Sequence, residues 1–125
     1  MADYRKILIV DDDMMNIKMV KRALGIGAYT LYEATSGMKA LETMQAVDFD
    51  LIILDIKMPV MDGIQVFEVM KKNKNLKDIP VIFLTAQNDI KDIKKALMLG
   101  AANYIVKPFL PMDLMSRVKE VLKTK

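Results

Sequence analysis

The sequence predicts an α/β fold in which a parallel five-stranded sheet is covered by helices on both faces. Five short apolar segments alternate with five longer segments whose apolar residues recur at helical spacing. The central segment, Leu51 to Leu54, is apolar without interruption, which is typical of a parallel strand buried on both faces. Strand–helix alternation at this spacing calls for right-handed crossovers, so we expect a three-layer sandwich.

The first strand–helix unit begins the chain. A strand over Lys6 to Val10 leads into an acidic triplet and then a helix from about Met14 to Leu24. Asp13 is the expected N-cap, and Gly25 and Gly27 close the helix.

The second unit has a strand of different character. In Thr30 to Ala34 apolar and polar residues tend to alternate, whereas the central strand is continuously apolar. This pattern favours an edge position in the sheet. Ser36 is expected to cap the following helix, whose apolar face carries Ala40, Leu41 and Met44.

The third unit follows the central strand. Met58-Pro59 stops any regular element, and Asp62-Gly63 supplies an N-cap and a flexible first turn. A helix from Gly63 to about Lys72 and a polar loop over Asn73 to Asp78 complete the unit.

The last two units follow Pro80. A strand over Val81 to Leu84 precedes a helix. Either Asn88 or Asp89 caps this helix, and Gly100 ends it. Its aligned apolar residues are Ile90, Ile93 and Leu97. A strand over Tyr104 to Val106 precedes the final helix. Pro111 lies in the first turn of that helix, and its apolar residues are Leu114, Met115, Val118, Val121 and Leu122.

Composition excludes several classes of protein. The chain has 125 residues, which fits one domain over residues 1–125, and it has no linker or repeat. No histidine or cysteine is present, which excludes imidazole bases, thiolate nucleophiles and the commonest zinc sites. The absence of a long apolar run and of a leader pattern predicts a cytoplasmic protein without a membrane contact. The net charge of +3 comes from dispersed lysines without interleaved aromatics, so we expect no direct nucleic-acid binding.

Four of the predicted strands end in polar residues. These residues are the acidic triplet Asp11-Asp12-Asp13, then Asp55, Thr85 and Lys107. Because the carboxyl ends of parallel strands meet at one edge, we expect these groups to converge where ligands bind in open α/β sheets. Crowded carboxylates raise each other's pKa unless a cation joins them, and oxygen ligands of this kind suit Mg²⁺.

An aspartate beside a metal ion and an ammonium group can carry out phosphoryl transfer. The carboxylate is a competent nucleophile toward phosphorus, and the transfer needs mainly positioning and neutralisation of charge. Lys107 is the candidate ammonium and Thr85 the candidate hydroxyl donor. The sequence has no P-loop, so a nucleotide is not the obvious donor.

The sequence resembles the receiver domains of two-component signalling over essentially its whole length. The matching motifs are the acidic pair after ILIV, LDIKMPVMDG around Asp55, LTA at Leu84 to Ala86, and the segment from Tyr104 to Phe109 that contains KPF. The resemblance implies the CheY-like, flavodoxin-like (βα)5 fold with strand order 2-1-3-4-5. It also implies a cis Lys107-Pro108 bond.

The resemblance also implies a role for each site residue. Asp55 would be the phospho-acceptor, Asp12 a direct Mg²⁺ ligand, and Asp11 a ligand through water. The backbone carbonyl of Lys57 would complete the protein's share of the coordination, and Thr85 and Lys107 would hold the phosphoryl oxygens. The phosphoryl group would come from a histidine of a sensor kinase or phosphotransfer protein, or from a small acyl phosphate.

Such a domain is a switch rather than an enzyme, because its transfer and autodephosphorylation chemistry acts on itself. By the resemblance, phosphorylation draws Thr85 inward and lets Tyr104 follow, which alters the surface of the fourth helix, fifth strand and fifth helix. An unknown downstream effector would bind there. We expect the three methionines near that surface to be core residues: Met98, Met112 and Met115.

Two rim residues differ from the best-known chemotaxis pattern. Lys57 follows the acceptor by two positions, and Gln87 follows Thr85 by two. Our hypothesis is that Lys57 contacts the phosphoryl group or the acidic pocket and changes the lifetime of the phosphorylated state. A lysine that points to water is the alternative.

Two other functions remain open from the sequence. A haloacid-dehalogenase-like phosphatase also uses an aspartyl nucleophile, but its DxDxT-type motif is missing at Asp11 and at Asp55. A receiver fold that binds a partner without phosphorylation is the second. The sequence leaves open whether the chain is a stand-alone protein or a piece of a longer one, and whether it is a monomer or dimerises on phosphorylation.

Overall fold

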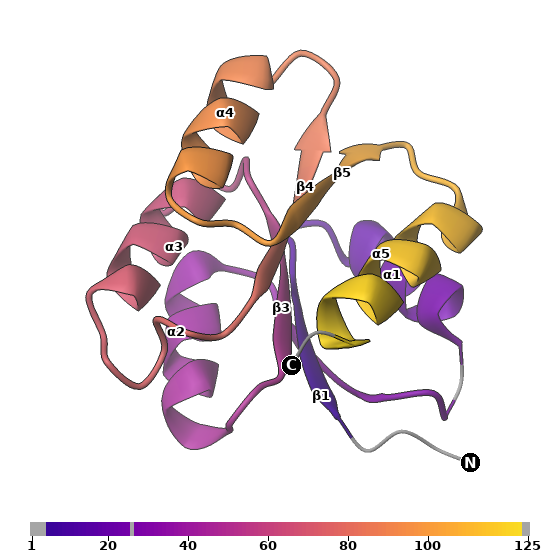
Figure 1. Cartoon of the computed structure of the whole chain (residues 1–125), viewed down its shortest axis with the longest axis horizontal. Helices are drawn as coiled ribbons and strands as arrows, with labels where there is room; N and C mark the ends of the chain where they lie inside the picture. Colours follow the sequence, from indigo (N-terminus) through magenta and orange to yellow (C-terminus); the bar gives the residue numbers. More distant parts are fainter. Residues whose placement is uncertain (1–4, 26, 124–125) are drawn as a thin grey trace.

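The computed structural model describes residues 5–25 and 27–123, which form ten alternating strands and helices around one sheet (Figure 1). The strands lie side by side in the order β2-β1-β3-β4-β5, and every pair is parallel. The predicted flavodoxin-like order is therefore confirmed. The elements are β1 (Lys6–Val10), α1 (Met14–Leu24), β2 (Thr30–Ala34), α2 (Gly37–Ala46), β3 (Leu51–Asp55), α3 (Gly63–Lys71), β4 (Val81–Ala86), α4 (Ile90–Met98), β5 (Asn103–Lys107) and α5 (Pro111–Lys123).

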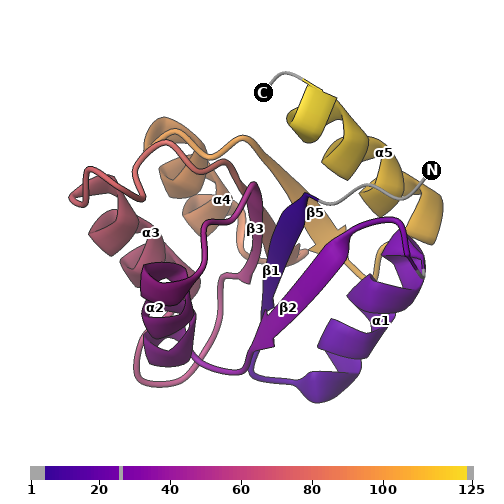
Figure 2. The same cartoon turned by 90° about the horizontal axis from the view of Figure 1, so that it is seen from below.

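Helices cover both faces of the sheet (Figure 2): α1 and α5 lie on one side, and α2, α3 and α4 on the other. Successive residues of a strand point to opposite faces, so each central strand feeds two cores. In β3, Ile52 and Leu54 pack toward α2 and α3, whereas Leu51 and Ile53 pack toward α1 and α5. Every residue of β3 is buried, which explains why its sequence runs apolar without alternation.

The helix starts agree with the predicted caps. The Asp13 carboxylate accepts from the Met15 N–H at 2.9 Å, and the Ser36 hydroxyl accepts from the Lys39 N–H at 3.1 Å. Asp62 and Gln65 form a capping box at the start of α3. Asp89 occupies the N-cap position of α4, but its side chain makes no capping hydrogen bond. The Lys107-Pro108 bond is cis, as predicted.

The prediction that Met98 and Met112 belong to the core is wrong. Met98 is 89% exposed on α4 and Met112 is 81% exposed on α5, whereas Met115 is partly buried. Helix α4 buries only Ala96, so the aligned apolar residues Ile90 and Leu97 are also exposed. A helix has one core-facing side, and here it carries the buried Ala96 together with Ile93, which packs partly against the core. Three further methionines are exposed along α1: Met14, Met15 and Met19.

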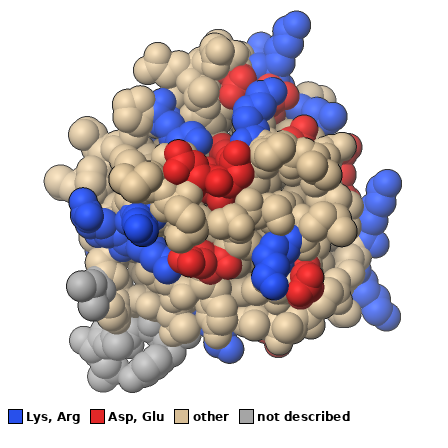
Figure 3. Space-filling model, turned by 180° about the vertical axis from the view of Figure 1, so that it is seen from behind, with Lys and Arg blue, Asp and Glu red and all other residues tan. Residues whose placement is uncertain are grey.

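The surface carries mixed charge. On the face drawn in Figure 3, lysine and arginine side chains are dispersed among acidic ones and form no continuous basic patch. No helix in the described part of the chain is long and apolar enough to span a membrane.

Candidate functional site

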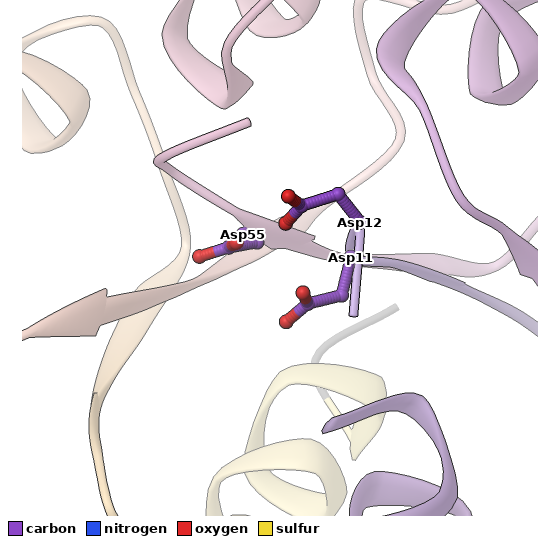
Figure 4. A group of neighbouring side chains, drawn as sticks. All are labelled: Asp11, Asp12 and Asp55. Carbon is purple, nitrogen blue, oxygen red and sulfur yellow. The ribbon is translucent and has the colours of Figure 1, made fainter. Parts of the chain in front are cut away.

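Three aspartates meet at the carboxyl ends of β1 and β3, which are neighbouring parallel strands (Figure 4). Val10 is in register with Leu54, so Asp11 and Asp55, the next residue on each strand, emerge beside one another. Asp12 follows at once in the loop. One carboxylate oxygen from each aspartate lies within 4.8 Å of the others. The sheet topology alone therefore brings together side chains that are far apart in sequence.

The three carboxylates have different environments. Asp11 is fully buried and Asp55 is 4% exposed, whereas Asp12 faces solvent. The Asp11 Oδ1 atom accepts a hydrogen bond from the Asp13 N–H at 3.0 Å, but the buried Oδ2 atom has no hydrogen-bond partner. A buried carboxylate oxygen without a donor is costly, and coordination of a cation removes that cost. This oxygen, together with Asp12 and Asp55, fits a small divalent cation.

Lys107 supplies the positive charge within the cluster. It ends β5, and its ammonium donates to Asp55 Oδ1 at 3.1 Å and lies 3.6 Å from Asp11 Oδ2. The longer distance is an electrostatic contact and not a hydrogen bond. Burial alone would lower the pKa of Lys107, but the negative charges of Asp55 and Asp11 raise it overall. Lys107 therefore stays charged.

The buried carboxyl groups are less acidic than usual. Burial, followed by the nearby charge of Asp11, raises the pKa of Asp55 to about 6, although Lys107 opposes the shift. Burial also raises the pKa of Asp11. One ammonium group thus compensates the cluster only in part, which leaves it with affinity for further positive charge.

The loop after β3 holds the Asp55 backbone tightly. The Gly63 N–H donates to the Ile56 carbonyl at 2.8 Å, which places the first residue of α3 against the end of the strand. The Met61 N–H reaches the Pro59 carbonyl at 2.7 Å, which forms a γ-turn around Val60, where φ is 68°. The loop is therefore a compact, defined structure beside the acidic cluster.

A cavity of about 260 Å³ opens above the cluster. Lys107 and the three aspartates line it together with Asn16, Lys57 and Asp89. Although Lys57 lies at the cavity, its ammonium is paired with Asp92 Oδ2 of α4 at 2.9 Å. That hydrogen bond raises the pKa of Lys57. Lys57 is 65% exposed and is paired with Asp92, and no ion pair joins it to the three clustered aspartates among the described residues. Its effect on the lifetime of a phosphorylated state stays a prediction.

Thr85 and Gln87 lie outside the acidic cluster. Thr85 is buried near the end of β4, and its hydroxyl donates to the Ala86 carbonyl at 3.2 Å. Gln87 is exposed in the turn after β4.

Tyr104 is partly buried on β5 opposite Phe83. The Arg117 guanidinium lies 5.7 Å from the centre of the Tyr104 ring and donates to the Tyr104 carbonyl at 2.7 Å and to Asn103 Oδ1 at 2.8 Å. Sequence reasoning missed both Arg117 and Asp92. The contacts of Arg117 with β5 and of Asp92 with Lys57 join different elements, and no local spacing signals either one.

A parallel sheet of this order with an acidic cluster and a lysine at its carboxyl edge defines a class of signalling domain, the receiver of two-component systems. The chain belongs to the response regulator receiver domain family, whose model matches residues 7–119. As a member of this family it is part of a signalling switch and not a classical enzyme.

Individual relatives agree with this membership. The transcriptional regulatory protein PrrA of Mycobacterium tuberculosis is 36% identical over 118 residues, which cover 94% of this chain and 50% of PrrA. The chain spans about half the length of the curated relatives it matches.

Solved structures show the same fold. Chemotaxis protein CheY4 of Vibrio cholerae has a TM-score of 0.87 and 31% identity, with 95% of this chain and 99% of that chain covered. The receiver domain of a histidine kinase from Syntrophus aciditrophicus has a TM-score of 0.87 and 34% identity, with 96% and 91% covered.

Proposed function

We propose that the chain accepts a phosphoryl group on Asp55 in a magnesium-dependent reaction and thereby switches a partner-binding surface. The observation that carries this proposal is the position of Asp55 Oδ1. It is held by Lys107 at 3.1 Å and lies in a cluster with two more carboxylates, one of which has a buried oxygen that accepts no hydrogen bond. The nucleophile Asp55, the Lys107 ammonium and the carboxylates that would hold Mg²⁺ therefore line one cavity.

The donor in this proposal is a phosphohistidine of a sensor histidine kinase or of a histidine phosphotransfer protein. A carboxylate oxygen of Asp55 attacks the phosphorus, and the new O–P bond forms as the P–N bond to the imidazole breaks. The imidazole leaves with the electron pair and takes up a proton. A small acyl phosphate can replace the phosphohistidine, because the acceptor chemistry is the same.

The other site residues have distinct proposed roles. Asp12, Asp55, the Lys57 backbone carbonyl and, through water, Asp11 would hold Mg²⁺, which supplies positive charge against the phosphoryl oxygens. Lys107 would turn from the carboxylate to a phosphoryl oxygen. Gln87, at the exposed rim, would affect how readily water reaches the phosphoryl group during autodephosphorylation.

The switch in this proposal begins at Thr85. A phosphoryl group adds about −1.5 to −2 units of charge, which favours a Thr85 hydroxyl turned toward it and away from the Ala86 carbonyl. Tyr104 would fill the space that Thr85 leaves, and the surface of α4, β5 and α5 would change for a downstream effector. PrrA is named as a transcriptional regulatory protein, so control of transcription through a further domain or partner is one such output.

Intact mass spectrometry tests the proposal. The chain is incubated with Mg²⁺ and acetyl phosphate, and we expect a gain of one phosphoryl group that EDTA prevents. Asp55→Asn should abolish the gain. Asp78→Asn, which neutralises an exposed carboxylate just before β4, should leave it unchanged.

Two results would contradict the proposal. Turnover of a generic phosphate ester with Mg²⁺ would favour a phosphatase of the haloacid-dehalogenase kind. No labelling by acetyl phosphate or by phosphohistidine donors would favour a binding module that works without phosphorylation.

A further inference from the structure

Lys57 and Asp92 form an ion pair that joins the β3–α3 loop to the first turn of α4. Lys57 Nζ lies 2.9 Å from Asp92 Oδ2, and the side chains are 65% and 31% exposed, respectively. Lys57 also lines the cavity that contains the acidic cluster. The same lysine therefore borders the proposed cation site while its charged end is held outside it.

The cavity has a strong attraction for a second ammonium group. Asp11, Asp12 and Asp55 contribute three carboxylates, and Lys107 is the one residue within positions 5–25 and 27–123 whose ammonium pairs with them. Lysine has a flexible four-carbon stem, so an ammonium at the cavity edge can reach several partners. Besides Asp92, the charges of Asp89 and Asp62 act on Lys57, and Asp89 itself lines the cavity. Without Asp92, Asp89 and the acidic cluster would attract the Lys57 ammonium toward the cavity that they line.

We propose that Asp92 is a positioning residue that holds the Lys57 ammonium away from the acidic cluster and so keeps the cluster open to a divalent cation. This inference rests on the proposed function, because it concerns the same cation site. An ammonium among the carboxylates would compete with Mg²⁺ for the same oxygens. The helix that carries Asp92 buries only Ala96, so the ion pair also ties a thinly packed element to the site.

Calorimetric titration of the full chain with MgCl₂ tests this inference without phosphorylation. We expect Asp92→Asn to weaken Mg²⁺ binding by about three- to fivefold, the upper end of what an exposed ion pair contributes. Lys57→Gln removes the ammonium and keeps the backbone carbonyl, so its affinity is the reference for the double variant. The double variant should bind Mg²⁺ within about twofold of Lys57→Gln, because the competing ammonium is then absent.

Two controls separate this effect from simple loss of negative charge. Asp78→Asn removes the same formal charge at the other end of the sheet and should change the affinity by less than about twofold, since salt screens distant charges. Asp92→Glu keeps a carboxylate that can hold Lys57 and should bind Mg²⁺ like the parent chain. This variant also tests the inference if Asp92→Asn does not fold.

Specific results would overturn the inference. Equal weakening by Asp92→Asn in the parent and in the Lys57→Gln background would mean that Asp92 acts through its own charge. An Asp92→Asn affinity equal to that of Asp78→Asn would mean that Lys57 does not compete. If the parent chain binds no Mg²⁺, the proposed cation site itself fails, and this result is distinct from the other two.

Discussion

Gly63 starts α3 in direct contact with the backbone of Asp55. An ideal Cβ on Gly63 would lie 2.2 Å from the Asp55 carbonyl oxygen and 3.0 Å from the Ile56 Cα. Both atoms belong to the backbone, so no rotation of a side chain can relieve the overlap. The close approach of the helix to the end of β3 therefore requires glycine at this position.

Gly63→Ala should destabilise the chain by about 1–3 kcal/mol, because the added methyl group forces the loop and the strand apart. Urea denaturation followed by circular dichroism measures this change. Gly37, at the start of α2, is the matched control, because its Cβ would meet side-chain atoms of Val66 at 2.8 Å and Met61 at 3.0 Å, and the Met61 carbonyl oxygen only at 3.0 Å, against 2.2 Å for the backbone contact of Gly63. Those side chains can move in part, so Gly37→Ala should cost less. Equal losses would contradict the prediction.

Stability without metal should depend on the ionisation of Asp55. Its pKa rises from the ordinary 3.8 to about 6 on folding, so the folded chain holds the proton more tightly. This contribution to stability is present below about pH 4 and is lost as the pH rises to about 6. In EDTA, the stability of Asp55→Asn should therefore rise relative to the parent over that range, by up to about 3 kcal/mol.

Thermal and urea unfolding between pH 4 and pH 7 measure this difference. For Asp78→Asn, which changes an exposed carboxylate, the free energy of unfolding should vary with pH in the same way as that of the parent chain. A constant difference between Asp55→Asn and the parent across the range would refute the assignment. Added Mg²⁺ should reduce the difference at pH 7, because a bound cation stabilises the ionised carboxylate of the parent.

Lys107→Met should lower the free energy of unfolding, because the crowded carboxylates then repel one another without a positive partner. The substitution keeps most of the stem but removes the only ammonium near Asp55 and Asp11 among the described residues. We expect a loss of about 2 kcal/mol at pH 7 in EDTA, because the buried charges lose their partner. Mg²⁺ should restore part of that stability. Lys119→Met, on the exposed side of α5, should show neither effect.

Arg117→Lys should destabilise the chain by about 1–2 kcal/mol, although the charge is kept. A lysine cannot reproduce the hydrogen bonds that the guanidinium donates to the Tyr104 carbonyl and to Asn103. Urea denaturation gives the loss, and the NMR signals of the Tyr104 ring should shift because the guanidinium no longer lies over it. If Arg117→Lys is as stable as Lys119→Ala, Arg117 has no such role.

The sequence predicted most of the fold because local signals and the global arrangement agree. The uninterrupted apolar run coincides with the buried strand β3. The predicted caps lie where their helices begin, at Asp13, Ser36 and Asp62. Sequence reasoning failed at α4. Its spacing correctly indicates a helix, but spacing alone cannot tell which side meets the sheet: Ala96 is buried there and Ile93 packs partly against the core, whereas Ile90 and Leu97 are exposed.

The acidic cluster was predictable because the ends of parallel strands share an edge. The ion pair of Lys57 with Asp92 was not, because it depends on how α4 approaches the loop after β3. The Asp11 oxygen without a hydrogen bond was not predictable either, since Asp11 and Asp12 are the same residue type and only the structure shows which one is buried.

Exposed methionines on different helices can serve as separate NMR reporters of the surfaces that carry them. Met98 and Met112 report on α4 and α5, while Met15 and Met19 report on α1. Methyl groups relax slowly, so carbon-13 labelling at methionine would show which of these helices a proposed partner contacts. The footprints of two partners could then be distinguished in a single sample without any added tag.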